Sequence, residues 1–151
     1  MNDEFWMSRA LSLAETAKSL GEVPVGALIV KDNCIIGTGF NTRELACDPL
    51  GHAEMNAITG ATQSLKTWRL IGCSLYVTLE PCLMCAGALY QSRISKVIFG
   101  AYDSKAGALK SLYSIHDDAR LNHRFEATGG ILENECSSMI SDFFRKKRKK
   151  G

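Results

Sequence analysis

Short apolar runs that alternate with helical segments are the feature that most constrains this fold. The runs are rich in β-branched and aromatic residues, and they occupy positions 25–31, 34–40, 74–79, 96–101 and about 127–132. Helical patterns are expected over 3–20, from about His52 to Thr62, from Pro81 onwards, and over about 133–150. Because strands that alternate with helices pack as one covered sheet, the sequence predicts an α/β fold of three layers, with helices on both faces of a five-stranded sheet.

Local signals indicate the strand directions. Asp32 and Asn33 join the first two runs, and this dipeptide is typical of a tight antiparallel hairpin. The later strands are separated by helices and should run parallel through right-handed crossovers. The central sheet should therefore be mixed.

Length and composition favour one soluble domain over 1–151. A chain of 151 residues suits a single core, and 46% hydrophobic with 23% charged residues is ordinary for a globular protein. No apolar run is long enough to cross a bilayer, and the N-terminus MNDEFW is acidic where a signal peptide would be basic. We therefore expect a cytoplasmic protein without membrane contact, in which Cys34, Cys73 and Cys136 are small core residues rather than disulfide partners.

Cys82 and Cys85 have the spacing of a metal-binding pair. Positions i and i+3 share one face of a helix, and a helix N-terminus favours the thiolate form that binds metal. His52 also lies at an expected helix start. If the two helix N-termini meet at one edge of the sheet, the side chains of His52, Cys82 and Cys85 come close together. Two thiolates and an imidazole are a normal zinc set, and three protein ligands leave a fourth position for water, as in catalytic sites.

Glu54 is the candidate proton carrier, because a carboxylate beside such a site can move a proton from water to a leaving nitrogen. Taken separately, each signal has a simpler interpretation. A Cys-x-x-Cys pair also occurs in redox dithiols, a single histidine is often a hydrogen-bonded polar residue, and a glutamate is commonly exposed. The joint pattern of His52-Ala53-Glu54 with Pro81-Cys82-Leu83-Met84-Cys85 favours zinc.

The C-terminal segment 145–150 reads RKKRKK, while the rest of the chain has more acidic than basic residues. A basic run of this kind can attract a phosphate backbone. It can equally be a solvated helix end that complements the helix dipole.

The two motifs match the zinc nucleoside and nucleobase deaminase signature. Beyond it, seven segments resemble the bacterial tRNA-specific adenosine deaminases of the cytidine and deoxycytidylate deaminase superfamily in order, at 22–30, 39–41, 48–58, 78–89, 92–108, 121–124 and 141–150. The resemblance implies a cytidine-deaminase-like fold, one zinc per subunit and a homodimer. It also implies conversion of the wobble adenosine in a tRNA anticodon to inosine, with hydroxide on zinc attacking adenine C6, Glu54 as the proton shuttle and ammonia released.

The same resemblance implies substrate contacts. Asn41 and the Ala53 backbone N–H would face the flipped base, and the anticodon loop would lie near Asp103, Lys105 and Asn122. The flanking nucleotides would lie near Phe143, Phe144 and Arg145. Simpler roles stay open: Asn41 as a turn residue, Asp103 as a loop cap, and the two phenylalanines as core anchors of the last helix.

Two other functions stay open. The same chemistry could act on free guanine, cytosine or a nucleotide. Alternatively, the chain could be a non-catalytic, zinc-stabilised RNA-binding module, with Cys47, His116 or His123 as a fourth protein ligand. His116 and the 109–120 segment have no other role that the sequence indicates.

Overall fold

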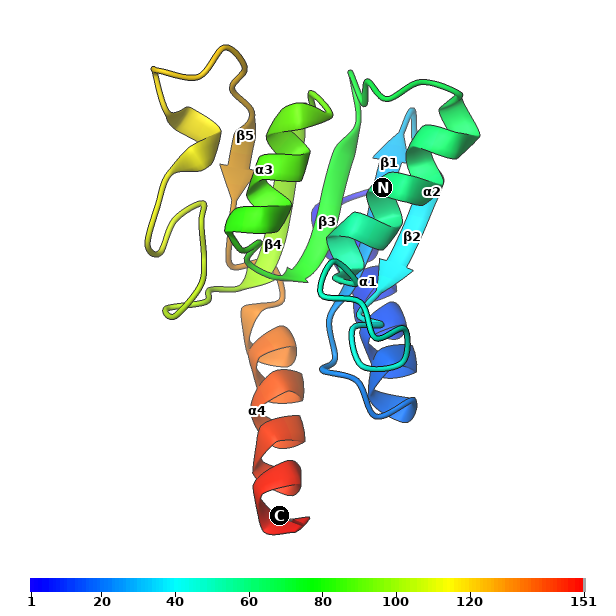
Figure 1. The fold of residues 1–151 in the computed structure, drawn as a ribbon, viewed down its shortest axis with the longest axis vertical. Coiled ribbons are helices and arrows are strands. Elements are labelled where there is room, and N and C mark those ends of the chain that lie inside the picture. Colours follow the sequence, from blue (N-terminus) through cyan, green and yellow to red (C-terminus); the bar gives the residue numbers. More distant parts are fainter. Residues whose placement is uncertain (151) are drawn as a thin grey trace.

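A five-stranded sheet forms the middle layer of the computed structural model, which describes residues 1–150 (Figure 1). The strands are β1 Gly26–Lys31, β2 Cys34–Phe40, β3 Ser74–Leu79, β4 Lys96–Ala101 and β5 Glu126–Thr128, in the spatial order β2-β1-β3-β4-β5. β1 pairs antiparallel with β2 and β3, whereas β3–β4 and β4–β5 are parallel. The predicted mixed sheet is confirmed, and β2, β3 and β4 point the same way. Of the expected domain 1–151, Gly151 lies outside the described residues.

Helices cover both faces of this sheet, as predicted. α2 Ala53–Leu65, α3 Leu83–Gln91 and the 3-10 helix η1 Ile115–Asp117 lie on one face, and α1 Asp3–Ser19 and the first turns of α4 Glu133–Lys150 lie on the other (Figure 1). Strand side chains alternate between two apolar clusters: Ile29 and Val77 pack with α2 and α3, whereas Leu28 and Tyr76 pack with α1 and α4. Within residues 1–150, no helix combines the length and apolarity needed to cross a membrane.

α4 leaves the sheet after its first turns. Cys136 is buried under the sheet, but residues 144–149 are exposed and the C-terminal end extends well past the sheet edge (Figure 1). The basic run is therefore carried on a projecting helix.

Several expected boundaries were wrong. The last strand spans Glu126–Thr128 and not 127–132, because Gly129 and Gly130 follow and Gly130 has a φ of 90°. The third helix begins at Leu83 rather than Pro81, since Cys82 is its extended N-cap.

Of the three cysteines expected in the core, Cys73 and Cys136 are buried as predicted. Cys34 is exposed at the hairpin, so that prediction was wrong.

The hairpin itself follows the prediction. Asp32 and Asn33 have φ values of 51° and 60°, the left-handed conformation that a two-residue type I′ turn requires. β1 and β2 are consequently adjacent and antiparallel.

α2 rests directly on the backbone of β2. A Cβ atom at Gly37 would overlap the carbonyl oxygen of Ala57 and approach the amide nitrogen of Ala61. A Cβ atom at Gly39 would overlap the carbonyl oxygen of Ala53 in the same way. The two glycines therefore set the distance between this helix and the sheet.

Gly37→Ala should lower the free energy of unfolding by about 1–3 kcal/mol or more, because the added methyl must push the α2 backbone away. The matched control is Gly60→Ala inside α2, where a Cβ atom has its nearest neighbour at 3.7 Å. There a helix-favouring residue should be neutral or add up to about 1 kcal/mol. Urea unfolding of both variants measures the difference, and equal stabilities would contradict the close packing.

Candidate metal centre and active-site cavity

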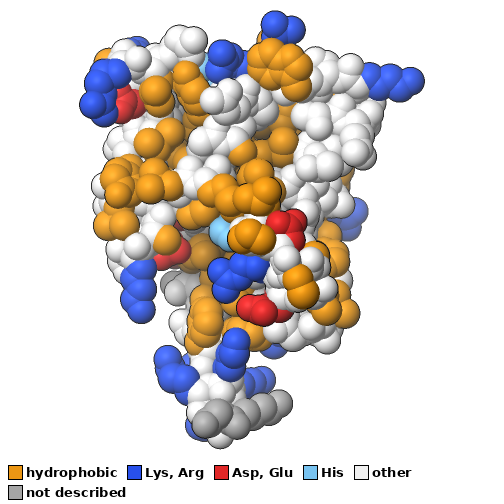
Figure 2. All heavy atoms as spheres, viewed as in Figure 1, with side chains coloured by type: hydrophobic (Ala, Val, Ile, Leu, Met, Phe, Trp, Pro, Cys, Tyr) orange, Lys and Arg blue, Asp and Glu red, His pale blue; other side chains and the backbone are white. Residues whose placement is uncertain are grey.

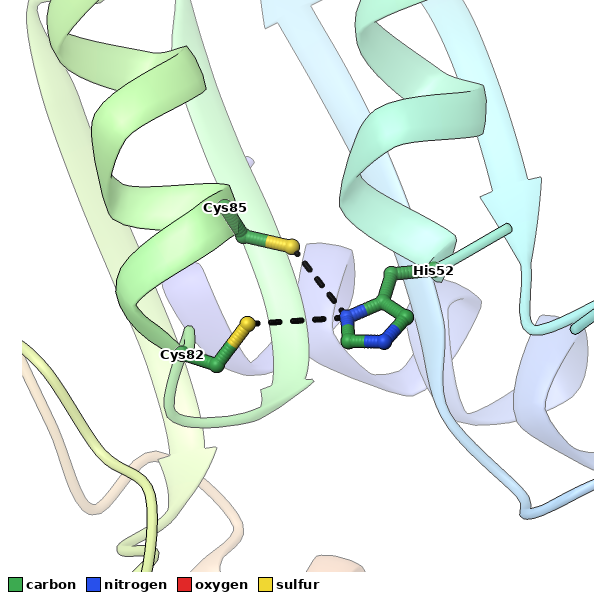
Figure 3. A group of neighbouring side chains, drawn as sticks. All are labelled: His52, Cys82 and Cys85. Atoms are coloured by element: carbon green, nitrogen blue, oxygen red, sulfur yellow. Dashed lines mark hydrogen bonds between the residues drawn. The ribbon is translucent and has the colours of Figure 1, made fainter. Parts of the chain in front are cut away.

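His52, Cys82 and Cys85 meet where two helices begin (Figure 3). His52 is the N-cap residue of α2, Cys82 is the N-cap residue of α3, and neither side chain makes a capping hydrogen bond. Cys85 lies one turn into α3 and is buried. The predicted convergence of two helix N-termini is present in the structure.

The spacing of the three ligand atoms fits one tetrahedral ion. His52 Nδ1 lies 3.6 Å from Cys82 Sγ and 3.4 Å from Cys85 Sγ, and the three atoms lie within 4.8 Å of one another. A zinc ion about 2.3 Å from sulfur and about 2.1 Å from nitrogen in tetrahedral geometry separates these two ligand atoms by about 3.6 Å. The donor set therefore suits zinc.

Hydrogen bonds within this cluster shift the pKa values of its three side chains. The Cys82 sulfur accepts hydrogen bonds from Cys85 and His52, which lowers the pKa of its thiol to about 3. The pKa of Cys85 is raised, first by its hydrogen bond to Cys82 and then by burial. The pKa of His52 is raised mainly by its hydrogen bond to Cys82. The lowered pKa favours the thiolate form of Cys82, which is the form that binds a metal.

Within residues 1–150, the side chains that lie close enough together to hold a metal are His52, Cys82 and Cys85. The candidates for a fourth protein ligand have other surroundings. Cys47 is exposed, His123 Nε2 pairs with the carbonyl oxygen of Ile94, and His116 is buried beside Phe125.

Glu54 lies beside the cluster as the second residue of α2, and its side chain is 4% exposed. Burial raises the pKa of this carboxyl to about 7. A carboxyl with that pKa both accepts and releases a proton near neutral pH.

A cavity of about 250 Å³ adjoins the cluster and Glu54. Of the expected substrate contacts, Asn41, Ala53, Asp103 and Phe144 line this cavity together with His52 and Cys82. Asn41 also fits its simpler role, since its Oδ1 accepts the Arg43 N–H at 3.2 Å. Asp103 Oδ1 likewise accepts the N–H groups of Lys105 and Ala106.

A larger groove of about 720 Å³ continues from the cavity along α4. It shares Asp103 and Phe144 with the cavity, and it is lined further out by Lys105, Arg145 and Arg148. Lys and Arg side chains gather around the projecting end of α4 in Figure 2. Phe144 is 39% exposed, so it is not a core anchor.

Two expected contacts line neither the cavity nor the groove. Asn122 is exposed and accepts a hydrogen bond from the Tyr90 hydroxyl. Phe143 lines a separate depression with Lys18, Lys146 and Lys147, on another side of α4.

Sequence reasoning missed the residues that shape the cavity walls. Arg43, Leu79 and Glu80 line the cavity, whereas Arg148 of the basic run identified in the sequence lines the groove. Glu80 is a single acidic residue after an apolar strand, directly before the Pro81-Cys82 motif, and that context was the available signal. Burial raises the pKa of Glu80, but hydrogen bonds from Ser111, Lys110 and Asp103 outweigh it and keep the pKa below the usual range.

Comparisons with known proteins find deaminases. The model of the MafB19-like deaminase family matches residues 1–148. The tRNA-specific adenosine deaminase of Haemophilus influenzae is 48% identical over 147 residues, which cover 97% of this chain and 85% of that protein.

Two solved structures extend the comparison. One, from work on A-to-I editing by tRNA:A34 deaminases at the wobble position of transfer RNA, is 37% identical with a TM-score of 0.85, and covers 88% of this chain and 96% of that chain. The guanine deaminase of Bacillus subtilis is 34% identical with a TM-score of 0.65, covering 74% of this chain and 82% of that chain. The chain described here belongs to the MafB19-like deaminase family and to the family of tRNA-specific adenosine deaminases.

Proposed function

We propose that this chain hydrolyses the wobble adenosine of a tRNA anticodon to inosine and releases ammonia. The observation that carries the proposal is the continuity of the site. A three-ligand metal cluster and a buried glutamate adjoin a small cavity, which leads into a groove lined by basic side chains.

The chemistry is that of metal-assisted hydrolysis, with one zinc ion per subunit on His52, Cys82 and Cys85. When bound, zinc would supply an activated water, because a three-ligand zinc site lowers the pKa of water to about 7. Glu54 takes a proton at its carboxylate and returns it to the leaving nitrogen, which its pKa near 7 suits.

The cavity accepts one base. The reacting atom of a stacked base is out of reach, so the base must leave the stack before it enters this cavity beside His52 and Glu54. Asn41 hydrogen-bonds the base from one wall, and the Ala53 N–H at the start of α2 faces its edge. An anticodon loop lowers the cost of this step because its bases are already unpaired.

The groove favours RNA over a free nucleobase. Asp103 and Lys105 contact the anticodon loop, while Phe144 and Arg145 contact flanking nucleotides along α4. Asn122 and Phe143 lie outside the groove, so their proposed RNA contacts require a substrate that reaches beyond it.

The proposal includes a homodimer in the cytoplasm, built from single-domain subunits. Exposed apolar side chains, among them Leu83, Leu112 and Tyr113, support a second copy as a partner. Hydrophobic side chains gather on the face that carries α2 and α3 (Figure 2).

Purified protein should produce inosine in total tRNA and leave free guanine, cytosine and adenosine unchanged. Glu54→Ala should retain its metal but lose about 10²–10⁴-fold in turnover, because the proton carrier is gone. Nucleoside analysis by mass spectrometry gives both readouts. Deamination of free guanine or cytosine with unmodified tRNA would favour the alternative substrates, and a near wild-type Glu54→Ala rate would remove the proton-shuttle role.

Cys85→Ser should lower the zinc content of the purified protein, because it replaces a thiolate ligand by a hydroxyl. Cys34→Ser is the matched control, since Cys34 is an exposed cysteine at the hairpin. Elemental analysis of both variants, with chelation and zinc restoration of the parent protein, tests the assignment. A zinc-free preparation with full activity would refute it.

Arg148→Ala should weaken binding of an anticodon stem-loop and reduce the slope of log affinity against log salt by about 0.7, the loss of one phosphate contact. Lys146→Ala, on the same helix but lining the separate depression, should change the slope less. Fluorescence titration across salt concentrations measures both slopes. Identical slopes for the parent and both variants would place the RNA away from α4.

A further inference from the structure

The buried carboxylate of Glu80 accepts several hydrogen bonds from the loop that follows β4. Oε1 accepts a hydrogen bond from the Asp103 N–H at 3.0 Å and another from the Ser111 hydroxyl. Oε2 accepts the N–H groups of Leu109, Lys110 and Ser111 at 3.2, 2.7 and 2.9 Å. One side chain thus binds both ends of the 103–111 loop.

The backbone around Glu80 ties the same two segments together. Its N–H donates to the carbonyl oxygen of Ala101 at 2.9 Å, and the Ala108 N–H donates to the carbonyl oxygen of Pro81 at 2.8 Å. Glu80 is 2% exposed, so the hydrogen bonds to its carboxylate are shielded from water and strengthened by the charge of the acceptor. The segment that carries Cys82 therefore also holds the loop after β4.

The 103–111 loop forms a wall of the site. Asp103 and Ala106 line both the cavity and the groove, and Lys105 lines the groove. Asp103 Oδ1 is itself engaged by the next turn of the loop, at 3.1 Å from the Lys105 N–H. The position of these side chains consequently depends on the closure of the loop.

We propose that Glu80 is a positioning residue for RNA: it holds the 103–111 loop in its binding geometry before the substrate arrives. The inference rests on the proposed function, because it assigns the loop to RNA binding. A loop ordered in advance has less entropy to lose when RNA binds, so the contribution of Glu80 falls on affinity rather than on the chemical step.

Glu80→Gln tests the idea, because the amide places an N–H₂ group among backbone N–H donors. The KM for an anticodon stem-loop should rise about tenfold or more while kcat stays within about threefold, as expected for lost uniform binding. Hydrogen exchange should accelerate at 103 and 109–111 but not in β3 or β4. Zinc content should equal that of the parent protein.

Two glutamates serve as controls. Glu15→Gln removes the same charge from an exposed position on α1 and should leave KM, kcat and loop exchange unchanged. Glu22 is also buried, and it accepts the N–H groups of Glu44 and Leu45 at 3.2 and 2.6 Å. Glu22→Gln should accelerate exchange at 44–45 and not at 103–111, which separates local anchoring from general loss of stability.

Milder variants cover the case in which Glu80→Gln does not fold. Gly107→Ala keeps every charge, but its Cβ atom would overlap the Glu80 carboxylate and displace it. Ser111→Ala removes the hydroxyl donor to Oε1. Both variants should raise KM, as is expected for Glu80→Gln, and should accelerate hydrogen exchange of the loop amides.

Binding of the stem-loop to Glu54→Ala protein, with and without Glu80→Gln, measures affinity in the absence of turnover. An unchanged dissociation constant, a fall in kcat at constant KM, or unaltered exchange of the loop amides would overturn the role of Glu80. Failure of the parent protein to bind or deaminate RNA, with loop exchange still dependent on Glu80, would instead refute the proposed function.

Discussion

The site depends on three strands, β2, β3 and β4, whose carboxyl ends lie at the same edge of the sheet. β2, β3 and β4 point the same way although the antiparallel β1 lies between β2 and β3. The segment after β2 leads to His52 and Glu54, the segment after β3 carries Glu80 and Cys82, and the segment after β4 carries Asp103. Three stretches far apart in the sequence thus supply one site, as is usual at the carboxyl edge of an open α/β sheet.

The close packing of α2 on β2 strengthens this convergence. Glycines on the strand and small residues on the helix bring the two backbones together, so the first turn of α2 has a defined height above the sheet. The N-cap residue of α2 is His52 of the candidate metal cluster, and its second residue is the buried Glu54, so the packing of α2 on β2 fixes the position of both.

The architecture and the Cys82/Cys85 pair could be predicted because their signals are local, and the joint His-Ala-Glu and Pro-Cys-x-x-Cys pattern added His52 to the candidate metal cluster. Strand alternation, the Asp32-Asn33 turn and the Cys82/Cys85 spacing each act within a few residues. Glu80 could not be assigned, since its partners lie 23 to 31 positions away in a loop without regular structure. Phe143 and Phe144 are adjacent in sequence but line different hollows, because successive helical positions differ by about 100° in direction.

Because α4 projects from the sheet, changes at its exposed end are separated from changes at the cavity. Its outer turns touch neither apolar cluster, so their length and charge can vary during evolution or engineering without disturbing the core. The inner cavity has less freedom, because its walls include the residues that begin α2 and the segments that follow β3 and β4. Under the proposed function, changes in RNA binding can therefore accumulate at the exposed end of α4 without changes to the cavity.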